Sequence, residues 1–156
     1  MKIREKMYNI VTYLPQSHSK YEKLYSLEAI KKNIVYVKTL ADATQYKSKK
    51  VLIISESYDI DEGAVKLIAE KHKACFLIDI SKIINSRGIS RAVLLSRLRT
   101  FLKFCIKYNA YYTFADFAKD DFELRSPREL IHIAGLLGVN EGQTKFALKM
   151  IQHYTE

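Results

Sequence analysis

The sequence has few of the residues that build disulfide frameworks, metal centres or membrane spans. Its two cysteines, Cys75 and Cys105, each lie in an apolar stretch. They predict buried, reduced thiols, and neither a disulfide framework nor a zinc site. No apolar run approaches the length of a membrane span, and residues 1–11 lack the core of a signal peptide. These absences predict a cytoplasmic protein with no membrane partner.

Motifs of the common enzyme classes are also missing. There is no Walker loop, no GxGxxG, no GxSxG, and no HxH, HxxE or CxxC pair to hold a metal. The four histidines are scattered: His18, His72, His132 and His153. His132 has apolar neighbours and is expected to be structural. One acidic group could gather a magnesium ion, although a surface loop is the favoured interpretation: Asp116, Asp120, Asp121 and Glu123.

Acidic residues are absent from one long segment. Between Ser81 and Ala115 there is no Asp or Glu, in a chain whose net charge is +9 and whose pI is near 9.4. Six of the seven arginines lie in or just beyond this segment: Arg87, Arg91, Arg97, Arg99, Arg125 and Arg128. Because a guanidinium group can grip phosphate with two parallel hydrogen bonds, this concentration predicts an anionic partner, with nucleic acid first. The alternative is a solvated basic helix face that keeps the protein soluble.

Short apolar segments alternate with segments of helical periodicity. The segments expected to form strands are 7–13, 34–37, 51–54, 74–78 and 110–114. The segments expected to form helices are 21–32, 40–46, 62–71, 80–84, 89–108, 127–137 and 141–154. This alternation predicts one α/β domain covering residues 1–156, with a parallel sheet of five strands and right-handed crossovers.

Basic residues gather in the loops that follow the last two expected strands. Five residues lie there: Lys82, Arg87, Arg91, Arg125 and Arg128. Because the loops after parallel strands meet at the carboxyl edge of a sheet, we expect these side chains to share one face. Arg125 and Arg128 also flank a helix start that Ser126 marks as an N-cap, where free N–H groups favour phosphate. The alternative for Arg125 is an ion pair with Asp120 or Glu123.

The long helix expected at 89–108 carries the remaining basic residues. Arg99, Lys103 and Lys107 follow one another at i, i+4 and i+8, and predict a row that faces solvent. Arg91 and Arg97 fall at the margins of the apolar stripe. Their stems then either lie along the stripe with the charged heads in water, or pair at an interface.

The order and spacing of these elements between about Ala74 and Met150 resemble the C-terminal half of archaeal ribonuclease P protein component 3. The matching residues are an RA element at Arg91-Ala92, an R-x-P-R-[DE]-L element at Arg125, Pro127, Arg128, Glu129 and Leu130, and a closing Gly138-Val139 pair. The resemblance implies a TIM-like barrel related to metal-dependent phosphoesterases that have lost their metal ligands. Members of the family are longer at the N-terminus, so we expect an incomplete barrel of about five strands. Its exposed edges favour self-association or a covering partner.

The resemblance also implies a function. Family members are non-catalytic subunits of ribonuclease P, which pair with protein component 2 and stabilise the RNA that removes the 5′ leader of precursor tRNA. Magnesium is expected on that RNA, and no cofactor on the protein. The residues predicted to contact RNA are Lys82, Arg87, Arg91, Arg97, Arg99, Lys103, Arg125 and Arg128. The alternatives are a remnant metal-dependent phosphoesterase and a basic scaffold that binds only protein.

Overall fold

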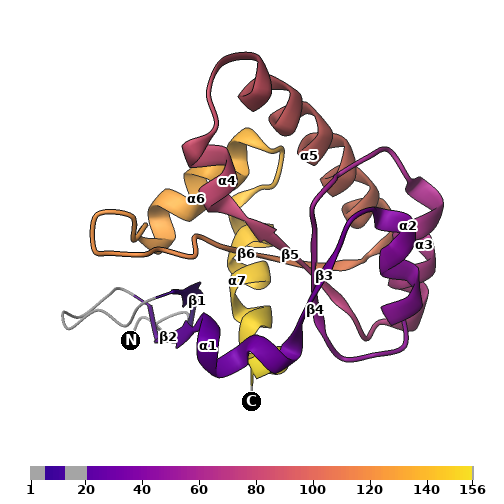
Figure 1. Ribbon diagram of the computed structural model, residues 1–156, viewed down its shortest axis with the longest axis horizontal. Helices are drawn as coiled ribbons and strands as arrows, with labels where there is room; N and C mark the ends of the chain where they lie inside the picture. The colour runs from indigo at the N-terminus through magenta and orange to yellow at the C-terminus, as the bar shows by residue number, and fades with distance from the viewer. Residues whose placement is uncertain (1–5, 13–20, 156) are drawn as a thin grey trace.

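The computed structural model describes residues 6–12 and 21–155 (Figure 1). Four parallel strands form the main sheet, in the order β3 (Ile34–Val37), β4 (Leu52–Ser55), β5 (Cys75–Asp79) and β6 (Tyr111–Ala115). A second, parallel pair consists of β1 (Tyr8–Val11) and β2 (Lys23–Ser26). The predicted α/β class and parallel strands are confirmed, but the described strands number six and divide between two sheets.

Seven α-helices accompany these strands in the described part of the chain. Their bounds are α1 (Leu27–Ile30), α2 (Leu40–Ala43), α3 (Glu62–Lys71), α4 (Ile80–Asn85), α5 (Gly88–Tyr108), α6 (Pro127–Leu136) and α7 (Glu141–Thr155). Single 3-10 turns follow α1 and α2. Six of the seven expected helices agree with these bounds to within two residues, once the 3-10 turn after α2 is counted. None of the helices in the described ranges is long and apolar enough to cross a membrane.

The helix predicted for residues 21–32 is wrong in its first part, which is strand β2. Leu24, Leu27 and Ile30 have helical spacing, but residues 23–26 pair in register with β1 instead. The ring of Tyr25 lies 6.0 Å from that of Tyr8 across the pair. Tertiary pairing with a neighbouring strand has outweighed a short helical pattern, as it often does for apolar runs of this length.

Strands β4, β5 and β6 of the main sheet are buried on both faces. On one face Phe76 and Ile78 of β5 pack with residues of α3 and α5, and the rings of Phe76 and Phe101 meet edge to face at 4.9 Å. On the other face Leu52 and Leu77 pack with residues of α7, which runs through the centre of Figure 1. This two-sided burial explains why the strands read as continuous apolar runs.

Two backbone hydrogen bonds join the β1–β2 pair to the chain that leaves β6. The Thr12 N–H donates to the Ala118 carbonyl (2.9 Å), and the Phe117 N–H donates to the Ile10 carbonyl (3.1 Å). The strands therefore follow one another in the order β2, β1, β6, β5, β4, β3. Among the described residues β2 and β3 do not pair, so the series is open at that point.

Local signals read from the sequence are confirmed in several places. Ser126 accepts from the Glu129 N–H and closes a capping box at the start of α6. Helix α7 begins with a similar pair, because Asn140 and Gln143 exchange two hydrogen bonds there, although neither residue is named in the sequence analysis above. Cys75 and Cys105 are buried and free, as expected, and burial raises the pKa of both thiols well above the ordinary value.

Candidate nucleic-acid interface

The two loops predicted to share the carboxyl edge of the sheet do come together. Helix α4 begins directly after β5, and its residues Ile84 and Asn85 line a small depression together with Asp116 and Arg125 from the chain after β6. The register of β5 against β6 sets Asp79 beside Ala115, so both strands end at this edge. The arrangement follows from two parallel strands that pair directly.

The side chain of Arg91 is hydrogen-bonded to the protein and only partly exposed to solvent. Its side chain is half-buried, and Nη2 donates to the Ile84 carbonyl at 2.9 Å. This bond ties the first turn of α5 to the end of α4. The Nε of Arg91 is buried without a hydrogen-bond partner in the described structure. Part of this guanidinium is therefore already used to hold the turn between the two helices.

Arg125 is tied into its own loop in a similar way. Its Nη1 donates to the Phe122 carbonyl (3.1 Å), and its own carbonyl accepts from the Tyr21 hydroxyl (2.6 Å). The two acids considered as partners bond to backbone of the same loop. Asp120 accepts from the Glu123 N–H (2.9 Å), and Glu123 accepts from the Lys119 N–H (3.0 Å).

Asp116 is a buried structural residue, so the predicted acidic surface loop is wrong for this position. It is 1% exposed, and its carboxylate accepts from the Ala118 N–H (3.0 Å) and the Arg125 N–H (2.8 Å). Buried Asn9 accepts in turn from the Asp116 N–H (3.2 Å). Burial is the main reason that the pKa of Asp116 is raised above its ordinary value. The sequence signal for this buried role is that Asp116 follows directly after an apolar strand. Asp79, the N-cap of α4, stands in the same position after the apolar run 74–78.

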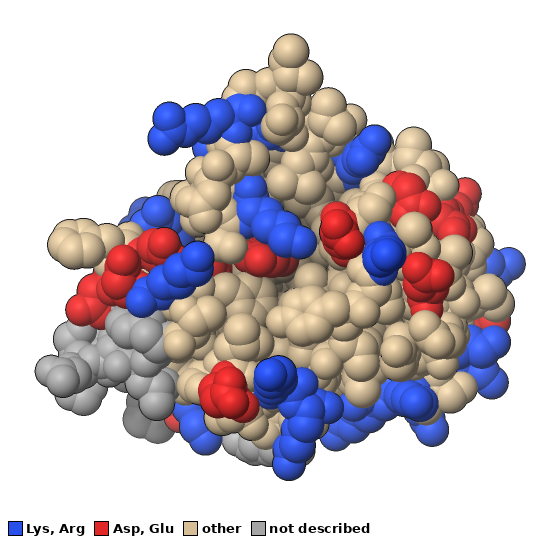
Figure 2. Space-filling view, in the orientation of Figure 1, with Lys and Arg blue, Asp and Glu red and all other residues tan. Residues whose placement is uncertain are grey.

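Six of the eight predicted RNA-binding residues have exposed side chains, and not all of the six lie at the carboxyl edge. The exposed residues are Lys82, Arg87, Arg97, Arg99, Lys103 and Arg128. Arg97 lines a groove with residues 56–58, which follow β4 and so lie at the same carboxyl edge, one strand farther from β6. Lys103 lies about 20 Å along α5 from the helix start. In Figure 2, the Lys and Arg side chains are likewise spread over the face that is drawn and do not form one block.

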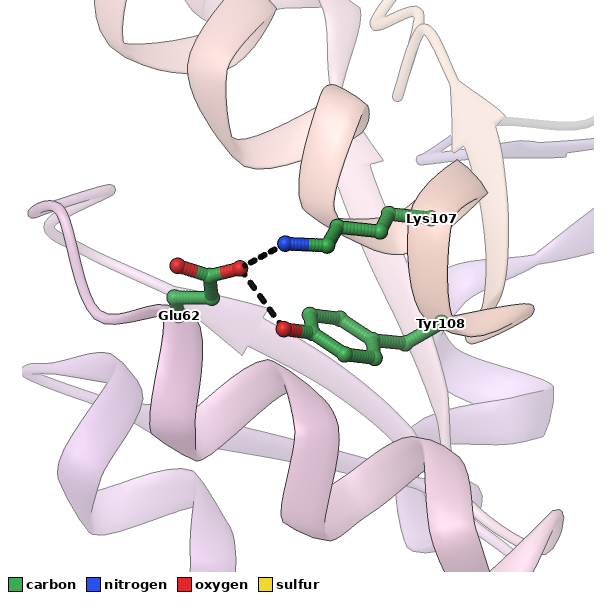
Figure 3. A network of polar contacts seen from close by, with 3 residues as sticks. All are labelled: Glu62, Lys107 and Tyr108. Atoms are coloured by element: carbon green, nitrogen blue, oxygen red, sulfur yellow. Dashed lines mark hydrogen bonds and ion pairs between the residues drawn. The ribbon is translucent and has the colours of Figure 1, made fainter.

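The row at Arg99, Lys103 and Lys107 has protein partners at both ends. Arg99 is exposed, yet its Nε donates to the Leu136 carbonyl at the end of α6 (2.8 Å). At the other end, Lys107 Nζ and the Tyr108 hydroxyl both donate to Glu62 Oε1, each at 2.6 Å (Figure 3). The hydrogen bond from Lys107 is the main reason that the pKa of Glu62 is lowered, and the same bond raises the pKa of Lys107.

The described residues contain no group of three or more His, Cys, Asp or Glu side chains that could hold a metal ion. Asp116 and Asp79 instead accept hydrogen bonds from neighbouring backbone. His132, expected to be structural, is exposed on α6 and lines a groove with Arg128. His18 lies outside the described residues.

Three curated proteins match the chain, and all are named ribonuclease P protein component 3. The one from Methanosarcina barkeri (strain Fusaro / DSM 804) is 32% identical over 97 residues, which is 62% of this chain and 40% of that protein. The one from Methanococcoides burtonii is 34% identical over 80 residues, covering 51% and 33%. The one from Methanosarcina acetivorans is 30% identical over 95 residues, covering 61% and 39%. The resemblance to ribonuclease P protein component 3 is confirmed.

The match to component 3 proteins spans at most 40% of the length of these relatives. No family model matches the chain. A chain of the cryo-EM structure of archaeal ribonuclease P with mature tRNA has the same fold, with a TM-score of 0.66 at 16% identity. That likeness covers 95% of this chain and 78% of the other. It agrees with the expected fragment of a TIM-like barrel.

Proposed function

We propose that this chain is a non-catalytic, RNA-binding protein subunit of ribonuclease P, which assists the catalytic RNA in removing the 5′ leader of precursor tRNA. The observation that carries the proposal is the similarity to three proteins named as component 3 of that enzyme. The charge supports it, because a net charge of +9 favours a polyanionic partner. The alternative of a remnant phosphoesterase is not favoured by these relatives.

The eight predicted residues take two roles in this proposal. Exposed cations at the carboxyl edge and on α5 contact phosphates directly, and phosphate contacts position a protein without reading bases. These residues are Lys82, Arg87, Arg97, Lys103 and Arg128. The others use part of the guanidinium on backbone carbonyls, so they hold the loops and offer only their remaining N–H groups to RNA. These residues are Arg91, Arg99 and Arg125.

The partners follow from the same proposal. The RNA subunit is the direct partner, protein component 2 is the protein partner, and precursor tRNA is reached through the RNA. Magnesium acts on the RNA. The open side of the strand series, between β2 and β3, is where a partner or a second copy would cover an exposed edge. We place the complex in the cytoplasm, where two free thiols remain reduced.

Reconstitution tests the proposal. The protein is added with component 2 to the ribonuclease P RNA at moderate magnesium, and cleavage of precursor tRNA is followed. We expect stimulation, and we expect Arg87→Ala with Arg128→Ala to reduce it. Extra magnesium should restore part of the loss, because magnesium ions and arginine side chains both reduce the repulsion between phosphates of the RNA backbone. Lys66→Ala is the matched control, because Lys66 is an exposed cation on α3 and is not among the residues predicted to contact RNA.

The control variant should behave as the unmodified protein. Absence of any stimulation, or an equal loss in the Lys66 control, would contradict the proposal. A separate assay addresses the phosphoesterase: protein alone, with magnesium or manganese and a generic phosphodiester, should show no turnover. Turnover that disappears in Asp120→Ala or Asp121→Ala would favour the enzyme.

A further inference from the structure

A second basic surface lies at the opposite edge of the sheet, outside every residue predicted to bind RNA. It is a cleft of about 590 Å³ at the amino ends of three strands. Lys50 precedes β4, His72 and Lys73 precede β5, and Tyr111 is the first residue of β6. Because these strands are parallel, this edge is the far end of the sheet from Arg125 and α4.

Helix α7 forms the other wall of the cleft. Phe146, Met150, His153 and Tyr154 recur at i, i+4, i+7 and i+8, which sets them on one helix face. Met150 and Tyr154 are buried in the floor, and the Tyr154 hydroxyl donates to the Lys73 carbonyl (2.6 Å), which fixes the helix to the start of β5. Phe146 stays 60% exposed. A large aromatic side chain left in solvent beside an apolar floor offers a surface for stacking.

The rim of the cleft is basic. The described residues that line it include Lys50, Lys73, His72 and His153, and none of them is acidic. Lys50, Lys73 and both histidines are exposed. Charge complementarity therefore favours an anionic occupant of the cleft over an apolar protein segment that carries no acidic residues.

His72 holds an unusual backbone conformation at this site. It ends α3 with φ 48° and ψ 39°, a left-handed geometry in which glycine is the usual residue. The position places its imidazole against Tyr111, with ring centroids 5.7 Å apart and planes inclined at 56°. This left-handed turn therefore sets the imidazole of His72 beside the first residue of β6.

We propose that this cleft binds unpaired nucleotides of RNA, with bases against Phe146 and the His72–Tyr111 pair and phosphates at Lys50 and Lys73. Alternation of aromatic surfaces with cations is the arrangement by which proteins hold single strands without sequence preference. The inference rests on the proposed function and adds to it a second contact, to single-stranded rather than structured RNA. The protein then touches RNA at both ends of its sheet.

The test uses a short fluorescent oligouridylate, whose binding is followed by anisotropy over a range of salt concentrations. Phe146→Ala should weaken binding by about 5- to 100-fold and leave the salt dependence unchanged, because stacking involves no ion release. Lys50→Ala should lower the salt slope by about 0.7. Leu136→Ala is the matched control: Leu136 is also 60% exposed but lies at the end of α6. It should bind as the unmodified protein does.

His72→Gly separates binding from stability. Glycine suits the left-handed position, so this variant should unfold at the same temperature or higher while binding the oligouridylate more weakly. In addition, 4-thiouridine in the oligomer should cross-link to residues 72, 111 or 146.

Two results distinguish the cleft from the proposed function. Cross-links confined to α4 and α5, or unchanged affinity in both Phe146→Ala and His72→Gly, would overturn the cleft while leaving ribonuclease P RNA binding intact. Failure of the unmodified protein to bind ribonuclease P RNA would overturn the proposed function itself.

Discussion

Arg91 provides a direct test of which arginines hold the fold and which contact RNA. In Arg91→Ala the hydrogen bond from Nη2 to the Ile84 carbonyl is lost. A hydrogen bond from a charged group contributes about 1.5–3 kcal/mol. Removing the side chain also removes the buried, unpaired Nε, which offsets part of this loss. We expect a net destabilisation of about 1–2 kcal/mol.

Thermal unfolding measures this change. For a chain of this size, 1–2 kcal/mol corresponds to a fall in Tm of roughly 2–8 °C. Arg91→Met is the companion variant, since it keeps an apolar stem and removes only the guanidinium. Arg87→Ala is the matched control, four residues earlier in the chain. Arg87 is exposed, and its side chain makes no capping hydrogen bond to the start of α5. Its Tm should stay close to that of the unmodified protein.

RNA binding should show the reverse pattern. Arg87→Ala should reduce the slope of affinity against salt by about one unit, the effect of losing one phosphate contact. Arg91→Met should leave that slope nearly unchanged. The reasoning is refuted if Arg91→Met keeps the native Tm and reduces the slope as much as Arg87→Ala does, because the guanidinium would then be a phosphate contact.

Four further predictions concern the buried groups and one helix cap. Asp116→Ala leaves two backbone N–H groups without their acceptor, and urea unfolding should show a loss of about 2–6 kcal/mol, at about 1–3 kcal/mol for each donor. Since the pKa of Asp116 is raised, the native state holds its proton more tightly than the unfolded chain does. The contribution of Asp116 to stability therefore falls as the pH rises from the pKa of the unfolded chain through the higher pKa of the native state. The stability of the unmodified protein minus that of Asp116→Asn should increase on acidification. Cys75 and Cys105 should resist a thiol reagent in the native protein and react on unfolding, because burial raises both pKa values. Ser126→Ala should lower stability by about 1 kcal/mol through loss of the α6 cap, measured by thermal unfolding.

The sequence predicted the main sheet well because its strands carry a strong local signal. Residues 51–54 and 74–78 are continuous apolar runs, and the structure buries both of their faces. Strand β2 was missed because Leu24, Leu27 and Ile30 satisfy helical spacing, while the reason for the strand, a partner at residues 8–11, is distant in the chain. Caps such as Ser126 were predictable because all their atoms lie within one turn.

The site could be predicted only where it depends on strand order. That the loops after β5 and β6 meet follows from parallel pairing of consecutive strands. The roles of single arginines do not follow, because the acceptors for Arg91 and Arg125 are backbone carbonyls that leave no mark in the sequence. The cleft at the amino edge was missed for a related reason. Lys50, His72 and Tyr111 precede or begin three different strands, and no motif links them.

The attachment of β1 has a consequence for how the protein is made. Thr12 bonds to Ala118, 106 positions later, and the Tyr8 hydroxyl donates to Gln152, 144 positions later. During synthesis these two contacts of β1 can therefore form only after β6 and α7 have left the ribosome. A two-stranded pair is marginally stable by itself, and its open edge can pair with the wrong strand of another nascent chain. The β1–β2 pair thus gains its contacts to β6 and α7 only after these later elements have been made.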